Sequence, residues 1–238
     1  MDYFKKRLYQ KNKVIVDLII RNGYLLLNYI KIRGSILFLF ALLFIIVFKN
    51  SELDGFSAIL YGIEPAVQRK IFPIMWLFFL IVPLLVTGDS QEKLLRKDFP
   101  IISRGVTLSK YLMTNIFLSL LLNSSFYLLV LVVNKFEIRT MSFVLYVFLF
   151  SCTFLLAFQL VSSVFFTSTV TLFIFLVPLI INVYKPYSTI IDGTMLVRFD
   201  VTKLGLNVLG LLCILSVLLF LTMIRIKKID FLERSGQQ

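Results

Sequence analysis

Six long apolar stretches, none of which contains a Lys, Arg, Asp or Glu, limit most strongly what this chain can fold into. A helix needs roughly 20 mostly apolar residues to cross the hydrocarbon core of a bilayer, which is about 30 Å thick. The whole chain is 59% hydrophobic and 16% charged, whereas soluble proteins average about 45–50% and about 25%. The sequence therefore predicts an all-α, polytopic membrane protein. The predicted spans are residues 35–48, 71–87, 111–133, 143–161, 164–184 and 204–224.

The distribution of basic residues predicts the orientation of these six spans. With the N-terminus inside, 17 of the 25 Lys and Arg residues fall in inner segments and 8 in outer loops, as the positive-inside rule requires. We therefore expect an N-in/C-in, multi-pass protein of the cell membrane, and the composition suits a bacterial inner membrane. Its predicted parts are an interfacial segment (1–34), a transmembrane domain (35–226) and a cytoplasmic tail (227–238).

The segment before the first span is predicted to be an amphipathic helix. A polar stripe runs along one face of an otherwise apolar helix, and its charged members are Lys13, Asp17, Arg21 and Lys31. Such a helix lies in the membrane interface with its basic stripe toward water and headgroups. Two readings stay open: a simple juxtamembrane anchor, or an elbow helix that bends into the first span.

The predicted cytoplasmic loop between the second and third spans, residues 88–110, carries a short helix. Asp89 or Ser90 can cap its N-terminus, and Pro100 disfavours helix at the residue before it, so we expect about two turns at 90–98. An apolar cluster among these charges either docks into a partner or folds back onto the membrane surface. The cluster comprises Leu94, Leu95 and Phe99.

This loop contains a familiar run. Phe99-Pro100-Ile101-Ile102-Ser103-Arg104, followed by Lys110-Tyr111-Leu112, resembles the P-[VI]-S-R…[GS]-K motif of type-2 ABC transporter permeases. Asp89 and Glu92 are the candidates for the acidic residue that precedes the proline in that family. The chain departs from the motif in two ways: the Gly-Thr after the acidic residue is absent, and one extra residue separates Pro100 from Ser103.

The resemblance implies six spans with both termini cytoplasmic, an N-terminal elbow helix and a coupling helix between spans 2 and 3. It also implies three partners: a separate ABC ATPase that carries ATP and Mg, a second permease subunit (identical or a sister chain), and membrane lipid. The ATPase would dock on residues 89–99. The candidate coupling residues are Asp89, Glu92, Leu94, Leu95, Arg96, Phe99, Pro100, Ser103 and Arg104.

Several chemistries are excluded by what the sequence lacks. There is no G-x-x-x-x-G-K-[ST], so we expect no ATP hydrolysis by this chain itself. With no His at all, His-dependent metal sites and catalytic triads are excluded. The charge-free spans argue against a proton-coupled pump, and the net charge of +12 reflects inner loops rather than nucleic-acid binding. We therefore expect no enzyme activity and no bound cofactor.

Four residues in spans 2 and 5 are candidates for lining a transport pathway, because the resemblance implies that these spans face each other across two permease subunits. They are Pro83, Phe175, Pro178 and Asn182. Polar and small residues within spans serve more often as contacts between helices. An apolar wall with scattered hydroxyls suits export of a hydrophobic or amphipathic substrate, such as a peptide or bacteriocin, an antimicrobial or a lipid. The alternative is a non-transporting membrane protein with a binding, immunity or sensor role.

Overall fold

The computed structural model describes the backbone of residues 2–48, 58–62, 72–90, 93, 108–133 and 138–228, and most side chains in these ranges from Val16 onward. All regular structure in these ranges is helical, which confirms the all-α prediction for the described part of the chain. The long helices are α1 (Asp2–Phe48), α3 (Ile74–Thr87), α5 (Leu108–Val133), α6 (Ile138–Val164), α7 (Ser168–Tyr184) and α9 (Leu204–Lys228). Three short helices precede α9: α8 (Thr189–Asp192), η1 (Leu196–Arg198) and η2 (Val201–Lys203).

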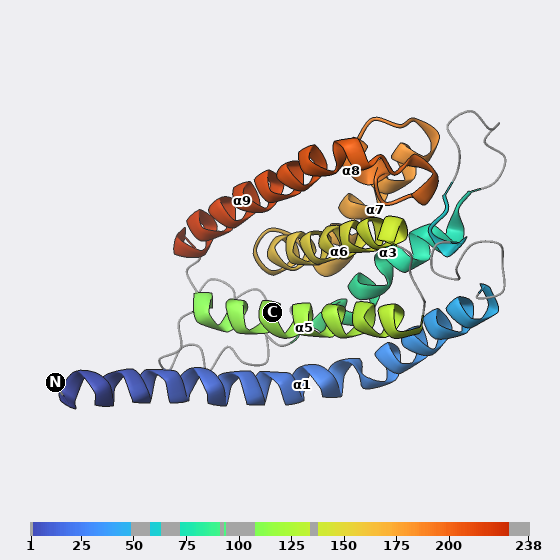
Figure 1. Ribbon diagram of the computed structural model, residues 1–238. Helices are drawn as coiled ribbons and strands as arrows, with labels where there is room; N and C mark the ends of the chain where they lie inside the picture. Colours follow the sequence, from blue (N-terminus) through green and yellow to red (C-terminus); the bar gives the residue numbers. More distant parts are fainter. Residues whose placement is uncertain are drawn as a thin grey trace.

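The helices run back and forth between two ends of one bundle (Figure 1). Helix α6 lies in the middle and contacts α3, α5, α7 and α9, while α1 lies along one side against α3 and α5. Helix α9 forms the opposite side. We call the end where α3 and α9 begin the α8 end, and the end where α3 and α9 finish the Asp89 end.

Four stretches are long and apolar enough to cross a membrane: Val16–Phe44, Lys110–Leu128, Met141–Ser163 and Val201–Arg225. The two other apolar helices, α3 and α7, have 14 and 17 residues. At about 1.5 Å per residue they are about 21 and 26 Å long, shorter than a hydrocarbon core of about 30 Å. The structure thus supports a membrane protein with four helices of spanning length, and six crossings stay a prediction.

The boundary between α6 and α7 differs from the prediction, which ends one span at residue 161 and begins the next at 164. Helix α6 continues to Val164, and α7 begins only at Ser168. The hydroxyls of Ser162 and Ser163 each donate to a carbonyl three residues earlier in α6. Because these polar side chains are satisfied within the helix, they do not end it.

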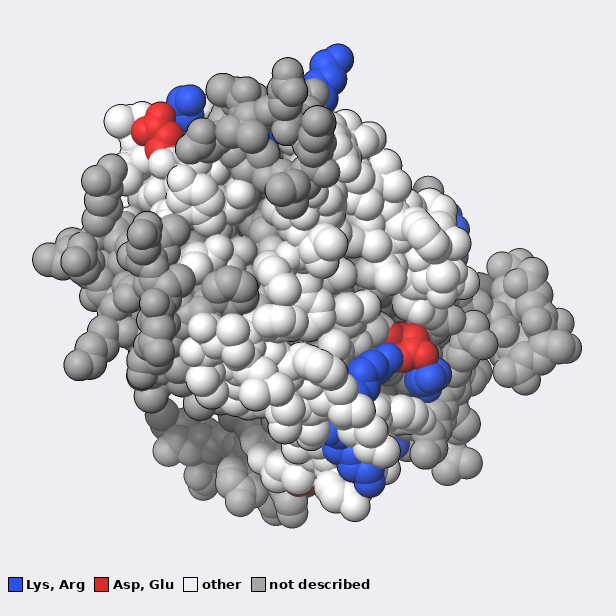
Figure 2. All heavy atoms as spheres, turned by 90° about the vertical axis from the view of Figure 1, so that its right-hand side faces the viewer, with Lys and Arg blue, Asp and Glu red and all other residues white. Residues whose placement is uncertain are grey.

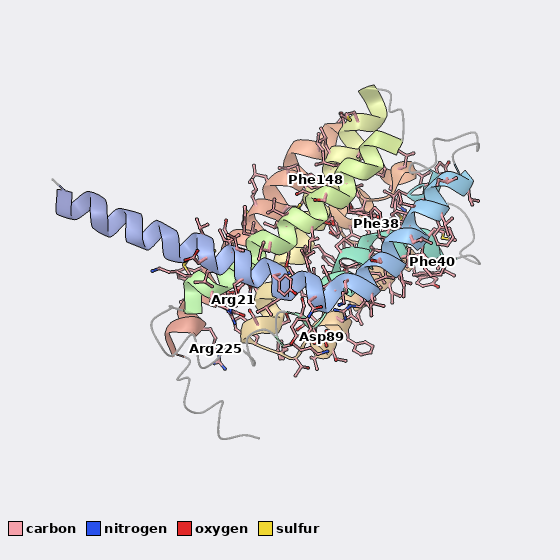
Figure 3. All side chains as sticks on the ribbon, turned by 90° about the horizontal axis from the view of Figure 1, so that it is seen from below. Arg21, Phe38, Phe40, Asp89, Phe148 and Arg225 are labelled. Atoms are coloured by element: carbon pink, nitrogen blue, oxygen red, sulfur yellow. The ribbon has the colours of Figure 1, made fainter. Side chains whose placement is uncertain are left out.

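The first helix covers both the predicted interfacial segment and the first predicted span. It is one continuous helix, α1, which changes direction in its second half (Figures 1 and 3). Both interpretations of the segment before the first span, an anchor or an elbow that bends into the span, stay predictions. Leu18, Asn22, Leu26 and Ile30, four residues apart, form a buried line, and three of them join an apolar cluster with Tyr111 and its neighbours on α5. This one-sided packing explains the continuity of α1. Its position at a membrane interface stays a prediction.

Aromatic side chains hold the middle of the bundle together. The rings of Phe38 (α1) and Phe79 (α3) both contact Phe126 (α5), with centroids 6.0 and 6.2 Å apart. Tyr127 (α5) reaches Phe148 (α6) at 5.4 Å. Such ring pairs stabilise a fold beyond the effect of burying their apolar surface. Here they join four helices into one core.

The outer surface of the described helices is largely apolar. Large hydrophobic side chains are exposed along α1, α7 and α9, for example Ile32 (69%), Phe173 (63%) and Leu206 (70%). Figure 2, which views the bundle end-on, shows a mostly uncharged face with acidic and basic side chains in a few isolated spots. A surface of this kind needs lipid or partner protein against it.

Candidate functional site at the Asp89 end

Helix α3 ends at the point where the predicted coupling loop begins. Pro83, inside α3, has no N–H to donate, and the hydroxyl of Thr87 donates to the carbonyl of Pro83 at 2.9 Å. Gly88 then turns the chain with φ +42°, and its N–H donates to the carbonyl of Leu84. A Cβ at Gly88 would lie 2.8 Å from Nη1 of Arg33. Glycine therefore lets the side chain of Arg33, from α1, lie across the end of α3.

Asp89 connects the end of α3 to α1. One oxygen of its carboxylate accepts a hydrogen bond from Nη1 of Arg33 at 3.2 Å, and the other forms an ion pair with Lys93. The N–H of Lys93 donates to the carbonyl of Asp89 at 2.9 Å, as in the first turn of a helix. The acidic residue that opens the loop is thus bonded both to α1 and to the loop's own first turn.

The charges around Asp89 keep its carboxylate ionised. Burial by itself would raise the pKa of Asp89, but hydrogen bonds from Lys93 and Arg33, together with their positive charges, lower it below its usual value. The pair is therefore ionic at neutral pH. With the side chains of Arg33 and Asp89 39% and 33% exposed, water screens their attraction.

Most of the other predicted coupling residues lie outside the described residues, so the helix expected at 90–98 and the motif after it stay predictions. These residues are Glu92, Leu94, Leu95, Arg96, Phe99, Pro100, Ser103 and Arg104. On α1, the side chain of Lys13 also lies outside the described part, whereas Asp17 and Lys31 are exposed and Arg21 is half-buried. In Figure 3, Arg21, Asp89 and Arg225 lie toward one end of the helices, with Phe38, Phe40 and Phe148 farther along.

A groove lies beside the Arg33–Asp89 contact. It is a half-enclosed cavity of about 280 Å³ between residues 27–38 of α1, 82–87 of α3 and 119–126 of α5, with Leu155 of α6 in one wall. We call it the α1–α3–α5 groove. Pro83, one of the four candidate pathway residues, lines it.

The other three candidate pathway residues lie on α7 and are engaged elsewhere. The ring of Phe175 packs on Phe154 of α6 with centroids 5.0 Å apart. Asn182 is fully buried and donates to Asp192 at 2.9 Å, while its oxygen accepts the N–H groups of Tyr187 and Ser188. The carbonyl of Pro178 accepts the hydroxyl of Tyr187 at 3.1 Å. Within one copy of the chain, the four candidates are therefore not brought together.

Asp192 and Arg198 form a buried network that the sequence analysis missed. Arg198, whose side chain is 5% exposed, pairs with Asp192 at 2.8 Å and donates to the carbonyls of Asn182 and Val183. The signal in the sequence was two opposite charges six residues apart in an apolar loop. This network closes the α8 end, where Trp76 of α3 also donates its indole N–H to the hydroxyl of Thr194.

The structure defines a class of protein but no family. An all-helical bundle with four apolar helices of spanning length and an apolar outer surface indicates a membrane protein. No protein-family model matches the chain, and neither does any curated protein or solved structure. Within the described residues, no group of three His, Cys, Asp or Glu side chains is placed to hold a metal ion.

Proposed function

We propose that this chain is the membrane subunit of a type-2 ABC exporter, which moves a hydrophobic or amphipathic substrate out of the cell with energy from a separate ATPase. The resemblance of residues 99–112 to the permease motif motivates the proposal. The contact between Arg33 and Asp89 carries it, because it links the start of the proposed docking loop to a second helix.

The contact suggests how a partner could act on the bundle. An ATPase docked on residues 89–99 would pull on α3, because this segment follows α3 directly in the chain, and would pull on α1 through the Asp89–Arg33 pair. ATP and Mg would be held by the ATPase, and a second permease subunit would cover part of the exposed apolar surface. Movement of α1 against α3 would open or close the α1–α3–α5 groove between them.

The apolar character of the exposed helix faces supports the proposed class of substrate. The described helices present mainly Phe, Leu, Ile and Val side chains to their surroundings. Apolar walls favour peptides with hydrophobic character, antimicrobials or lipids over ions or sugars, because a polar solute would lose its hydration without new hydrogen bonds.

The test is purification of the tagged chain from its native membrane in mild detergent, with mass spectrometry of the proteins that accompany it. We expect a stoichiometric P-loop ATPase, and we expect its loss when Leu94, Leu95 and Phe99 are all changed to Ala. The matched control changes three exposed residues of α9 to Ala, namely Leu206, Leu209 and Leu212. It should retain the ATPase.

A chain that purifies without any ATPase in several detergents would contradict the exporter proposal. That result would favour the alternative, a non-transporting binding, immunity or sensor protein, for which the exposed apolar faces would bind partner helices. If the triple variant still retained the ATPase, the docking site would lie outside residues 89–99.

A further inference from the structure

The lining of the α1–α3–α5 groove is mainly apolar, although several polar residues contribute to it. The hydroxyls of Thr87, Ser119 and Ser125 each donate to a carbonyl four residues earlier in their own helix. The side chain of Asn123 is bonded to Ser151 and Cys152 on α6. With these hydrogen bonds already made, the groove suits an apolar occupant rather than water.

The length of the groove fits a single extended chain. Along α1 it extends over the twelve residues from Leu27 to Phe38, which are eleven steps of about 1.5 Å, or about 16 Å. This is close to half of a hydrocarbon core of about 30 Å, the depth of one leaflet. Because the groove is only half enclosed, a chain lying along it would keep one side toward the surrounding lipid.

The charge of the groove lining changes along its length. Lys31, one turn from the Leu27 end and about 10 Å from Phe38 along α1, is exposed and is the one charged residue in the lining. Arg33 and Lys93 lie around Asp89 at the end of α3. Among the described residues here, three basic side chains against one carboxylate leave this part of the groove net positive. The opposite end, at Phe38, is apolar. This change from basic to apolar lining along the groove matches a molecule with an anionic head and a long apolar tail.

We propose that the groove binds one acyl chain of an anionic phospholipid, with the phosphate at Lys31 and the chain extending toward Phe38. The site needs only that the protein lies in a membrane, and it does not depend on transport. A lipid held there would fill the space between α1 and α3 and oppose their closure.

Photo-crosslinking tests the position of the acyl chain. The full-length chain, in nanodiscs of phosphatidylcholine with a minor fraction of phosphatidylglycerol carrying a diazirine in its acyl chain, would be irradiated and its labelled peptides mapped. We expect labels concentrated at residues 27–38 and 119–126. Ser125→Phe should fill the groove and lower this labelling several-fold. The matched control is Ser216→Phe, because Ser216 is likewise an exposed membrane-helix serine bonded to its own i−4 carbonyl.

Competition by unlabelled lipid tests the headgroup. Phosphatidylglycerol should displace the probe better than phosphatidylcholine, and Lys31→Gln should reduce that preference about fivefold, the equivalent of about 1 kcal/mol for one basic residue near a lipid surface. Lys185→Gln, at an exposed lysine beyond the α8 end of the groove, should leave the preference unchanged.

Three results would overturn the proposal. The first is labelling spread evenly over the groove and the exposed face of α9. The second is equal loss of labelling in Ser125→Phe and Ser216→Phe, with both variants unfolding at the temperature of the parent. The third is crosslinking of groove residues to a second copy of the chain, which would make the groove a subunit interface.

Discussion

The two ends of the bundle are held together by different kinds of contact. At the α8 end, Arg198 and Asp192 form an ion pair whose arginine is almost fully buried, and Trp76 is bonded to Thr194 in the core. At the Asp89 end, Asp89 is held by half-exposed cations beside a half-enclosed groove. Local openings begin where buried contacts are few. We therefore expect the α8 end to be the fixed end and the Asp89 end to be the one that moves.

The largest expected effect is at the α8 end. Arg198→Met leaves the carboxylate of Asp192 without its cation in a mostly buried site, so the free energy of unfolding should fall by about 3 kcal/mol. The measurement is unfolding of the purified chain in detergent, by heat or by SDS titration. In the control, Lys203→Met, the ion pair with Asp200 is exposed to solvent, so its loss should change the stability little. Equal losses in the two variants would remove the distinction between buried and exposed pairs on which the comparison depends.

A smaller effect is expected from Gly88, at the other end. Its φ of +42° is unfavourable for residues with a Cβ, and the new methyl group would displace Arg33, so Gly88→Ala should cost about 1–3 kcal/mol. Gly205→Ala is the control, because it lies in a helix with nothing within 4 Å and should gain up to about 1 kcal/mol. Stabilisation by both substitutions in the same unfolding assay would show that the turn after α3 is not constrained as described.

The hydrogen bond between α1 and α5 is expected to contribute less than the turn at Gly88. The amide of Asn22 donates to Asn115 at 2.9 Å, and both side chains are buried. Asn22→Leu should cost about 0.6–1.7 kcal/mol, the range for hydrogen bonds between membrane helices. The double variant Asn22→Leu, Asn115→Leu should recover part of the loss, because no amide is then left unsatisfied. Asn28→Leu, on the exposed face of α1, should have no effect. Equal losses in Asn22→Leu and Asn28→Leu would assign the effect to helix propensity instead.

The sequence placed the helices well because apolar runs are local signals. Each predicted span overlaps an apolar helix in the described residues, four of these helices are long enough to cross a membrane, and the helix of the second span, α3, ends at the predicted residue, Thr87. The boundary near Ser162 and Ser163 was misplaced because a run of hydroxyls looks like a turn, although each hydroxyl can bond inside a helix. The packing of α1 against α5 was not predictable, because periodicity along one helix does not report which helix it contacts.

The candidate site was only partly predictable. Asp89 was recognised from its place before a proline, but its partner Arg33 lies 56 residues earlier in a segment that was interpreted only by its polar face. The Asn22–Asn115 pair spans 93 residues in the same way. Asn182 was chosen as a pathway residue, and in the structure its side chain holds the chain that follows α7. Pairings across such distances depend on tertiary packing, which the spacing of residues along one helix cannot give.

The smallest expected effect is the pH dependence of the Asp89 end. Because the pKa of Asp89 is lowered in the folded chain from its ordinary 3.8, its ion pairs stabilise the fold above about that pH and are lost as the pH falls through the lower folded value. Asp89→Asn should therefore lower the unfolding temperature slightly at pH 7. The free energy of unfolding should fall by less than about 1 kcal/mol, because such ion pairs are exposed. The difference from the parent should narrow as the pH falls below 3.8 and through the lower folded pKa of Asp89, and it should also shrink in high salt. A difference that stayed unchanged over this whole fall in pH would mean that Asp89 acts through packing or neutral hydrogen bonds. The Asp89 end would then not be held by charge, and a docked partner would have no ionic link from the loop to α1.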